Sequence, residues 1–144
     1  MTIWKSPVSL EKATEHTENT LVTHLGIEYT EVGDNYLSAK MPVDHRTKQP
    51  IGIMHGGASC VLAESLGSIA GNLCIDYEKQ VCVGLSINTN HVRMAKKGFV
   101  HGKATPIHIG RRNQVWEVTI HDDQGKLVSV SRLTLAVIER TDIS

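Results

Sequence analysis

The stretch QPIGIMHGGASCVLAESLGSIAGNLCI, residues 49–75, predicts one long helix that opens at His55-Gly56-Gly57. Its only formally charged side chain is that of Glu64, whose neighbours along the helix are small or apolar. We therefore expect the carboxylate to be buried, where an unpaired ion costs on the order of several kcal/mol. A chain that bears this cost usually has a use for the acid, so Glu64 is the first candidate for a functional residue.

Two faces of this helix suit close packing. One is a broad apolar stripe at spacings of three and four residues: Ala58, Leu62, Ser65, Leu66, Ile69 and Leu73. The other gathers small residues around the acid: Cys60, Glu64, Gly67, Ser68 and Gly71. Small residues allow a ligand or the backbone of another subunit to approach closely. One small sheet does not easily cover both faces, so we expect a homo-oligomer.

The rest of the chain predicts a further helix and a set of strands. Ser9 is a candidate cap for a first helix over residues 9–25. Strand patterns follow in two hairpin-linked segments before the long helix and in four after it: residues 25–32, 36–43, 81–92, 99–109, 113–121 and 127–138. Short turns between consecutive strands predict antiparallel pairing. We expect one α+β domain, residues 1–144, whose sheet covers the long helix.

The composition excludes several classes of function. Basic and acidic side chains number 15 each and aromatic residues make up 4%, which argues against a nucleic-acid or membrane-surface protein. Cys60, Cys74 and Cys82 lack metal-type spacing and indicate free thiols in a reducing cytoplasm. No signal peptide or membrane span is predicted. Metal-ligand spacings, serine-nucleophile motifs and nucleotide-binding glycine motifs are missing, so we expect no metal and no cofactor.

The start of the long helix predicts an anion or oxyanion site. The N–H groups of Gly56 and Gly57 lack intrahelical partners and side-chain cover, and the helix dipole adds positive potential there. Glu64 lies about 12 Å further along the helix, too far for both to act on one carbon. If two copies of the helix run antiparallel across a dimer axis, Glu64 of one copy faces His55 and Gly56 of the other. Geometry therefore favours a site between subunits.

Each of these features also has a purely structural interpretation. Glu64 can be a structural acid bonded to a serine or a backbone group, and His55 can be only a polar cap. The two glycines can exist to permit a tight turn. A basic cluster at the predicted strand ends is either solvated or grips the phosphates of an anionic ligand. Its members are Arg93, Lys96, Lys97, Arg111 and Arg112.

The order Gln49, His55-Gly56-Gly57, Leu62-Ala63-Glu64 and Ser68 resembles the hotdog-fold acyl-CoA thioesterases, in the branch whose catalytic carboxylate is a helical glutamate. The resemblance spans nearly the whole chain and includes the segments GLSINTNHVR, PIHIGRR, QVWEVTI and SRLTLAVI. Within that branch the chain is similar to the bacterial 1,4-dihydroxy-2-naphthoyl-CoA hydrolases of menaquinone synthesis and to the carrier-protein proofreading thioesterase of enterobactin synthesis. It departs from them at Ile51, Ile53-Met54 and Cys60, which bears on the acyl pocket.

The resemblance implies a sheet wrapped around the long helix, subunits paired edge to edge and dimers paired into a tetramer. It implies that the Gly56 N–H holds the thioester oxyanion, that Gln49 and His55 orient the carbonyl or its loop, and that no metal takes part. Glu64 of the partner subunit would act as nucleophile or as base toward water, with Ser68 holding the carboxylate or the water. CoA would lie against Gly84, His91, Val92, Arg93, Met94, His108, Ile109, Gly110, Arg111, Arg112 and Asn113.

Three other functions compete with thioester hydrolysis. A hotdog dehydratase or hydratase needs a histidine and an acid arranged for proton transfer on the acyl chain, which the spacing of His55 and Glu64 does not match. A non-catalytic acyl-CoA sensor would need a DNA-binding segment, for which 144 residues leave no room. A scaffold domain would leave Glu64 unexplained. The acyl group, and the choice between CoA and a carrier protein, stay open.

Overall fold

Within residues 1–143, which the computed structural model describes, six strands form one antiparallel sheet. In chain order the elements are α1 (Leu10–Ala13), α2 (Leu21–His24), β1 (Glu28–Val32), β2 (Leu37–Pro42), α3 (Gly56–Leu73), β3 (Gln80–His91), β4 (Phe99–Ile109), β5 (Asn113–Asp122), β6 (Leu127–Glu139) and the 3-10 turn η1 (Arg140–Ile143).

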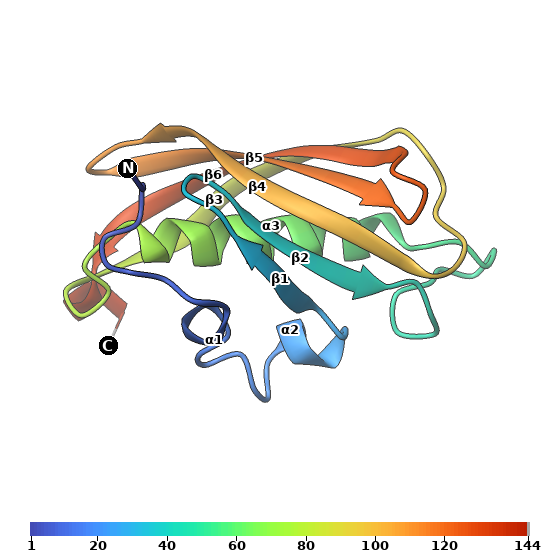
Figure 1. Cartoon of the computed structure of the whole chain (residues 1–144), viewed down its shortest axis with the longest axis horizontal. Coiled ribbons are helices and arrows are strands. Elements are labelled where there is room, and N and C mark those ends of the chain that lie inside the picture. Colours follow the sequence, from blue (N-terminus) through green and yellow to red (C-terminus); the bar gives the residue numbers. More distant parts are fainter. Residues whose placement is uncertain (144) are drawn as a thin grey trace.

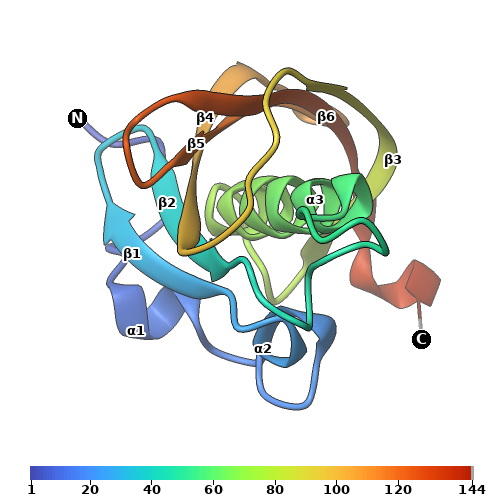
Figure 2. The same cartoon turned by 90° about the vertical axis from the view of Figure 1, so that its right-hand side faces the viewer.

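The sheet wraps around α3 in the strand order β1-β2-β4-β5-β6-β3 (Figures 1 and 2). Figure 2, which looks nearly along α3, shows the strands curving over the helix, with α2 on the side that the sheet leaves open. This arrangement is the hotdog fold, so the predicted fold class is confirmed. No helix in the described part of the chain is long and apolar enough to cross a membrane.

The core lies between α3 and the concave face of the sheet. Alternate residues of the strands point inward because side chains along a strand alternate between its two faces. Large buried side chains of the core include Leu37 and Met41 on β2, Trp116, Val118 and Ile120 on β5, Leu133 and Leu135 on β6, and Leu62 and Leu66 on α3. Gln114 is also buried; it accepts a hydrogen bond from Trp116 Nε1 (2.8 Å) and donates to the Gly71 carbonyl (3.3 Å), which ties the helix to the sheet.

Part of the small-residue face of α3 packs against this same sheet, not against a ligand or another subunit. A Cβ on Gly67 would lie 2.5 Å from Leu133 Cδ2, and one on Gly71 would lie 2.6 Å from Leu135 Cδ1. These glycines therefore let α3 approach its own sheet. Glu64 and Ser68 stand outside this contact, so the predicted stripe divides into a buried and an accessible part.

The predicted first helix over residues 9–25 is wrong. Ser9 does cap α1, because its hydroxyl accepts a hydrogen bond from the Lys12 N–H (3.2 Å), but the helix ends after one turn. His16 and Asn19 then adopt positive φ angles of 67° and 59°. Thr14 and Thr17 donate hydrogen bonds to backbone carbonyls three residues earlier, and such local bonds compete with continued helix.

The strand predictions are confirmed to within three residues at each end, but one connection differs. The hairpins β1–β2, β4–β5 and β5–β6 are antiparallel neighbours as expected. The link between β3 and β4 is no hairpin, since β3 pairs with β6 and β4 pairs with β2. The carbonyls of Ala95 and Gly98 in this link instead accept hydrogen bonds from Met54 and Val43 (both 2.8 Å). The β3–β4 link is therefore hydrogen-bonded to the loop that leads into α3.

Candidate active site

The start of α3 leaves one glycine N–H without a partner. His55 is the N-cap, and its Nδ1 accepts a hydrogen bond from the Gly57 N–H (2.7 Å). The Gly56 N–H donates to no acceptor within residues 1–143. The expectation of two available N–H groups is therefore wrong, because the His55 ring occupies the second. His55 is a cap that leaves Gly56 as the available donor at the positive end of the helix dipole.

The ring of His91, the last residue of β3, lies directly over Gly56. A Cβ on Gly56 would be 3.0 Å from His91 Nε2 and 3.1 Å from His91 Cε1. The resemblance implied that His91 binds CoA, but in this chain its imidazole stands beside Gly56, whose N–H is unpartnered within residues 1–143. Glycine at position 56 is what allows the two to lie so close.

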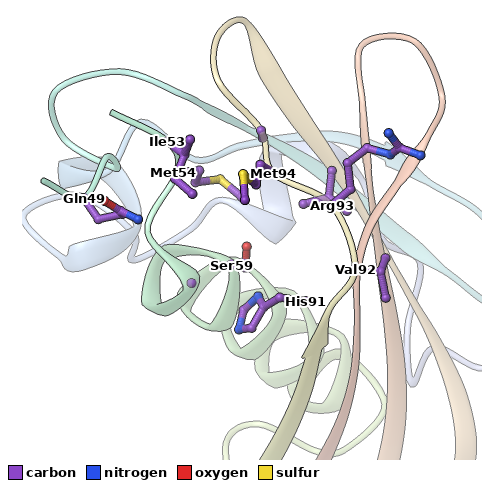
Figure 3. A pocket seen from close by; sticks show the side chains of 11 residues that line it. Gln49, Ile53, Met54, Ser59, His91, Val92, Arg93 and Met94 are labelled. Carbon is purple, nitrogen blue, oxygen red and sulfur yellow. The ribbon is translucent and has the colours of Figure 1, made fainter. Parts of the chain in front are cut away.

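Gln49 presents its amide nitrogen to the same region. Its Oε1 accepts a hydrogen bond from the Ile51 N–H (2.6 Å), which identifies that atom as the oxygen and leaves the NH₂ group as a donor. Figure 3 shows the nitrogen on the side facing α3. Gln49 and Gly56 thus both supply N–H groups to one space.

That space is a pocket of about 430 Å³ between the start of α3, the loop before it and the end of β3 (Figure 3). Its volume is within the usual range for small-ligand sites. It is lined by Gln49, Ile53, Met54, Gly56, Ser59, His91, Val92, Arg93, Met94, Ala95 and Val128. Six of these were predicted site residues. Ser59, Ala95 and Val128 were missed, and Ile53-Met54 had been noted only as departures from relatives.

Thr47 holds the loop that carries Gln49 and His55, and sequence reasoning did not single it out. Its side chain is buried, donates to the Pro42 carbonyl (2.7 Å) and accepts from the Asp44 N–H (3.1 Å). Its own carbonyl accepts the His55 N–H (2.7 Å). A buried threonine with three such bonds anchors the loop to the end of β2 and sets the position of the N-cap. The sequence shows only a threonine in a polar loop, and threonine is too common in such loops to single out this one.

Glu64 lies outside the pocket, and the expectation that it is buried is wrong for this chain by itself. Its side chain is exposed and makes no hydrogen bond or ion pair within the described residues. The carboxylate faces β3, where a Cβ on Gly84 would lie 3.2 Å from Glu64 Oε2. Ser68 is one turn further along α3, and no hydrogen bond joins it to Glu64. The neighbours Leu62 and Ala63 belong to the core, while the Glu64 side chain is exposed beside the edge strand β3.

The predicted CoA-binding residues separate into two groups. Gly84 pairs with Leu135, and Leu135 pairs with Gln114, so Gly84 lies level with the end of the β4–β5 hairpin that holds residues 108–113. His91 lies seven residues further along β3, about 23 Å away at the usual rise of a strand. Val92, Arg93 and Met94 follow it at the pocket. One chain therefore places Glu64 and Gly84 near one end of β3, and Gln49, Gly56 and His91 near the other.

The turn between β4 and β5 carries basic side chains that lie apart from Arg93 at the pocket. The Gly110 N–H donates to the Asn113 carbonyl (2.9 Å), and the His108 ring lies over Gly110, where a Cβ would be 2.5 Å from His108 Nε2. The Arg111 and Arg112 side chains are exposed and form no ion pair within residues 1–143. Both are available to an anionic ligand.

Two of the three cysteines, Cys74 and Cys82, are not activated as nucleophiles. All three are free thiols. Burial raises the pKa of Cys74 to about 12 and that of Cys82 to about 11, so both stay protonated at neutral pH. No group of three histidine, cysteine, aspartate or glutamate side chains in residues 1–143 is placed to hold a metal ion.

Comparison with known proteins gives concordant matches. The family model described as Thioesterase superfamily matches residues 51–129. The 1,4-dihydroxy-2-naphthoyl-CoA hydrolase of Escherichia coli K12 is 52% identical over 94% of this chain and 99% of its own. The proofreading thioesterase EntH of Cronobacter turicensis is 49% identical over 94% of this chain and 98% of its own.

The fold is shared with a solved thioesterase. The crystal structure of thioesterase HI1161 from Haemophilus influenzae superposes with a TM-score of 0.91 at 48% identity, covering 96% of both chains. The family match and these full-length relatives show that the chain belongs to the Thioesterase superfamily and is a thioesterase with the hotdog fold.

Proposed function

We propose that this thioesterase hydrolyses acyl-CoA thioesters with an aromatic acyl group, such as 1,4-dihydroxy-2-naphthoyl-CoA in menaquinone synthesis, to the free acid and CoA. Two observations support this substrate class. The pocket beside Gly56 has largely apolar walls, and a hydrolase of that substrate is 52% identical to this chain. The three free thiols fit the cytoplasm as its compartment.

The observation that carries the proposal is the unpartnered Gly56 N–H at the pocket. A thioester carbonyl oxygen that accepts from this N–H is polarised, and the negative charge of the tetrahedral intermediate develops at the same donor. Such a donor contributes about 3–4 kcal/mol to lowering the barrier. The Gln49 amide NH₂ is a second donor that orients the carbonyl.

Glu64 of a second subunit supplies the reacting carboxylate. β3 is an edge strand of twelve residues, and Val83 and Leu85 on it are exposed although apolar. An exposed strand edge is suited to pairing with another strand. Two β3 strands paired antiparallel place the Gly84 end of one beside the His91 end of the other. Glu64 then approaches the partner's pocket, which completes the site, and two such dimers associate into a tetramer.

Two routes use this geometry. In the first, a Glu64 oxygen attacks the thioester carbon, the C–S bond breaks to release the CoA thiolate, and water hydrolyses the resulting anhydride. In the second, Glu64 takes a proton from water, whose oxygen attacks instead. In both routes Ser68 holds the carboxylate or the water, and the thiolate leaves without a strong acid.

The basic side chains hold CoA. Arg93 lies at the pocket, and His108, Arg111 and Arg112 lie at the β4–β5 turn, which pairing through β3 would bring near the partner's pocket. Exposed guanidinium groups suit phosphates. Arg93→Ala should therefore raise KM for CoA esters several-fold with little change in kcat, whereas an unchanged KM would separate Arg93 from CoA.

Replacement of the acid tests the proposed mechanism. Glu64→Gln should leave folding and assembly intact and remove nearly all hydrolysis, because the amide neither attacks nor accepts a proton. Steady-state hydrolysis of aromatic and aliphatic CoA esters measures this, with circular dichroism and light scattering as controls of fold and size. Wild-type turnover in this variant would exclude Glu64 from the reaction.

A second candidate is proofreading hydrolysis of aryl or acyl groups held on a carrier protein. It is favoured by the 49% identity to a proofreading thioesterase. An acylated carrier protein in the same substrate panel separates the two functions, because a higher kcat/KM for the carrier-bound acyl group would assign the proofreading reaction.

A further inference from the structure

The pocket contains a buried hydroxyl that the proposed reaction does not use. Ser59 lies on α3, one turn after Gly56, and its side chain is 1% exposed. Its Oγ has no hydrogen-bond partner within residues 1–143. Figure 3 shows this oxygen pointing from the helix toward the space between Met54, Met94 and His91.

An unsatisfied buried hydroxyl inside a helix is unfavourable, because it has lost water without gaining a protein partner. Alanine at this position would remove the penalty and favour the helix. Apart from Gln49, His91 and Arg93, the other side chains that line the pocket are apolar: Ile53, Met54, Val92, Met94, Ala95 and Val128. A pocket of this kind, with few polar groups, uses them to orient its ligand.

Ser59 is not placed as a nucleophile. A catalytic serine needs a base within hydrogen-bond distance, and no side chain in the described part of the chain accepts from its Oγ. His91 lines the same pocket but makes no hydrogen bond to Ser59. The hydroxyl is therefore available to a ligand group and not to covalent chemistry.

We propose that Ser59 is a specificity-determining residue that hydrogen-bonds a hydroxyl substituent on the aromatic acyl group, at a position meta to the thioester carbonyl. This inference rests on the proposed acyl-CoA hydrolysis, in which Gly56 holds the carbonyl oxygen. Residues three apart on a helix have Cβ positions about 5–6 Å apart on one face, so the ligand oxygens bound at Gly56 and Ser59 are separated by a similar distance. An ortho hydroxyl lies within hydrogen-bond distance of its own carbonyl oxygen, at about 3 Å or less, and does not span this gap.

The test compares three CoA esters, benzoyl, 2-hydroxybenzoyl and 3-hydroxybenzoyl, in the wild type and Ser59→Ala. Ser59→Ala should lower kcat/KM for the 3-hydroxybenzoyl ester by about threefold to tenfold, the effect of one neutral hydrogen bond. The other two esters should change less than twofold. Ser59→Cys, which keeps the size and offers only a weak donor, should show the same selective loss.

Ser129→Ala is the matched control. Ser129 on β6 is also buried with an unpartnered hydroxyl, but it does not line the pocket. Both alanine variants should melt at or above the wild-type temperature, and Ser129→Ala should leave all three ratios unchanged.

The outcomes separate the inference from the proposed function. If the wild type hydrolyses these esters and Ser59→Ala lowers kcat/KM equally for all three, or for none, the inference is wrong and the hydrolase proposal stands. If the wild type hydrolyses none of them, aromatic acyl-CoA hydrolysis is wrong and the inference fails with it.

Discussion

Replacing Gly56 by proline removes the proposed oxyanion donor while disturbing the helix little. Gly56 is the first residue of α3, where proline is well accepted because the N–H has no intrahelical partner. The preceding residue, His55, has φ −68° and ψ 131°, a conformation that a following proline favours. The substitution therefore deletes one N–H from a helix that is otherwise able to form.

The expected loss follows from what the N–H does. Removing an oxyanion donor costs about 3–4 kcal/mol of transition-state stabilisation, or roughly 100-fold to 1,000-fold in kcat/KM. The proline ring also adds atoms beside His91, whose Nε2 is 3.0 Å from the position of a Cβ at residue 56. Gly56→Ala adds that same Cβ and keeps the N–H, so it measures the steric part alone. Because the His91 side chain is exposed and can shift, the alanine variant should lose less than about tenfold.

Hydrolysis of an aromatic CoA ester by wild type, Gly56→Ala and Gly56→Pro gives the comparison, with thermal melting to show that all three are folded. The proline variant should have a kcat/KM at least tenfold lower than that of the alanine variant. Equal kcat/KM values for the two variants would mean that the Gly56 N–H does not hold the oxyanion.

Three further predictions concern the surroundings of the site. Thr47→Val removes the side-chain hydrogen bonds that anchor the loop, so urea titration should show a free energy of unfolding lower by about 1–3 kcal/mol. The kcat/KM of this variant should also fall. Gly84→Ala places a Cβ 3.2 Å from Glu64 Oε2 and should reduce turnover about tenfold without unfolding, since small misplacements of a reacting group are costly; an unchanged kcat would show that the carboxylate adapts. Hydrogen bonds from Arg46 lower the pKa of Asp44 to about 2, below its unfolded value near 4, so its stabilising contribution is full above about pH 4 and is lost as pH falls toward 2. Asp44→Asn should accordingly be less stable than wild type at pH 7 and equally stable near pH 2 by urea unfolding.

Periodicity was sufficient to predict the main elements of the fold. The change from a helical period to a period of two after residue 75 placed α3 and the four strands that follow it, because each element has one face in the core. The prediction of one first helix was wrong because residues 14–20 are polar and their side chains hydrogen-bond to nearby backbone groups. Helix propensity alone does not account for this competition. The prediction of a β3–β4 hairpin was wrong because this link bonds to Val43 and Met54, residues about 40 to 55 positions earlier in the chain.

The sequence motif of the candidate site was predictable, but its geometry was not. The His55-Gly56-Gly57 sequence identified the helix start, but only the three-dimensional structure shows that the His55 ring takes the Gly57 N–H. Glu64 was predicted to be buried because its sequence neighbours are apolar, yet its side chain is exposed beside the edge strand β3. Ser59 resembled any helical serine, since its unpartnered state depends on residues of the loop and of β3 that pack around it.

A complementation experiment tests most directly whether Glu64 and Gly56 act across a subunit interface. Glu64→Gln and Gly56→Pro chains, each nearly inactive alone, are co-expressed in equal amounts with different tags, and the mixed oligomer is purified and assayed. A mixed dimer has one site with both changes and one with neither, and random pairing makes half of the dimers mixed. Tetramers that carry both tags should therefore retain about a quarter of wild-type activity. Activity no higher than that of the two parent variants, in oligomers shown to contain both chains, would contradict a site shared between subunits.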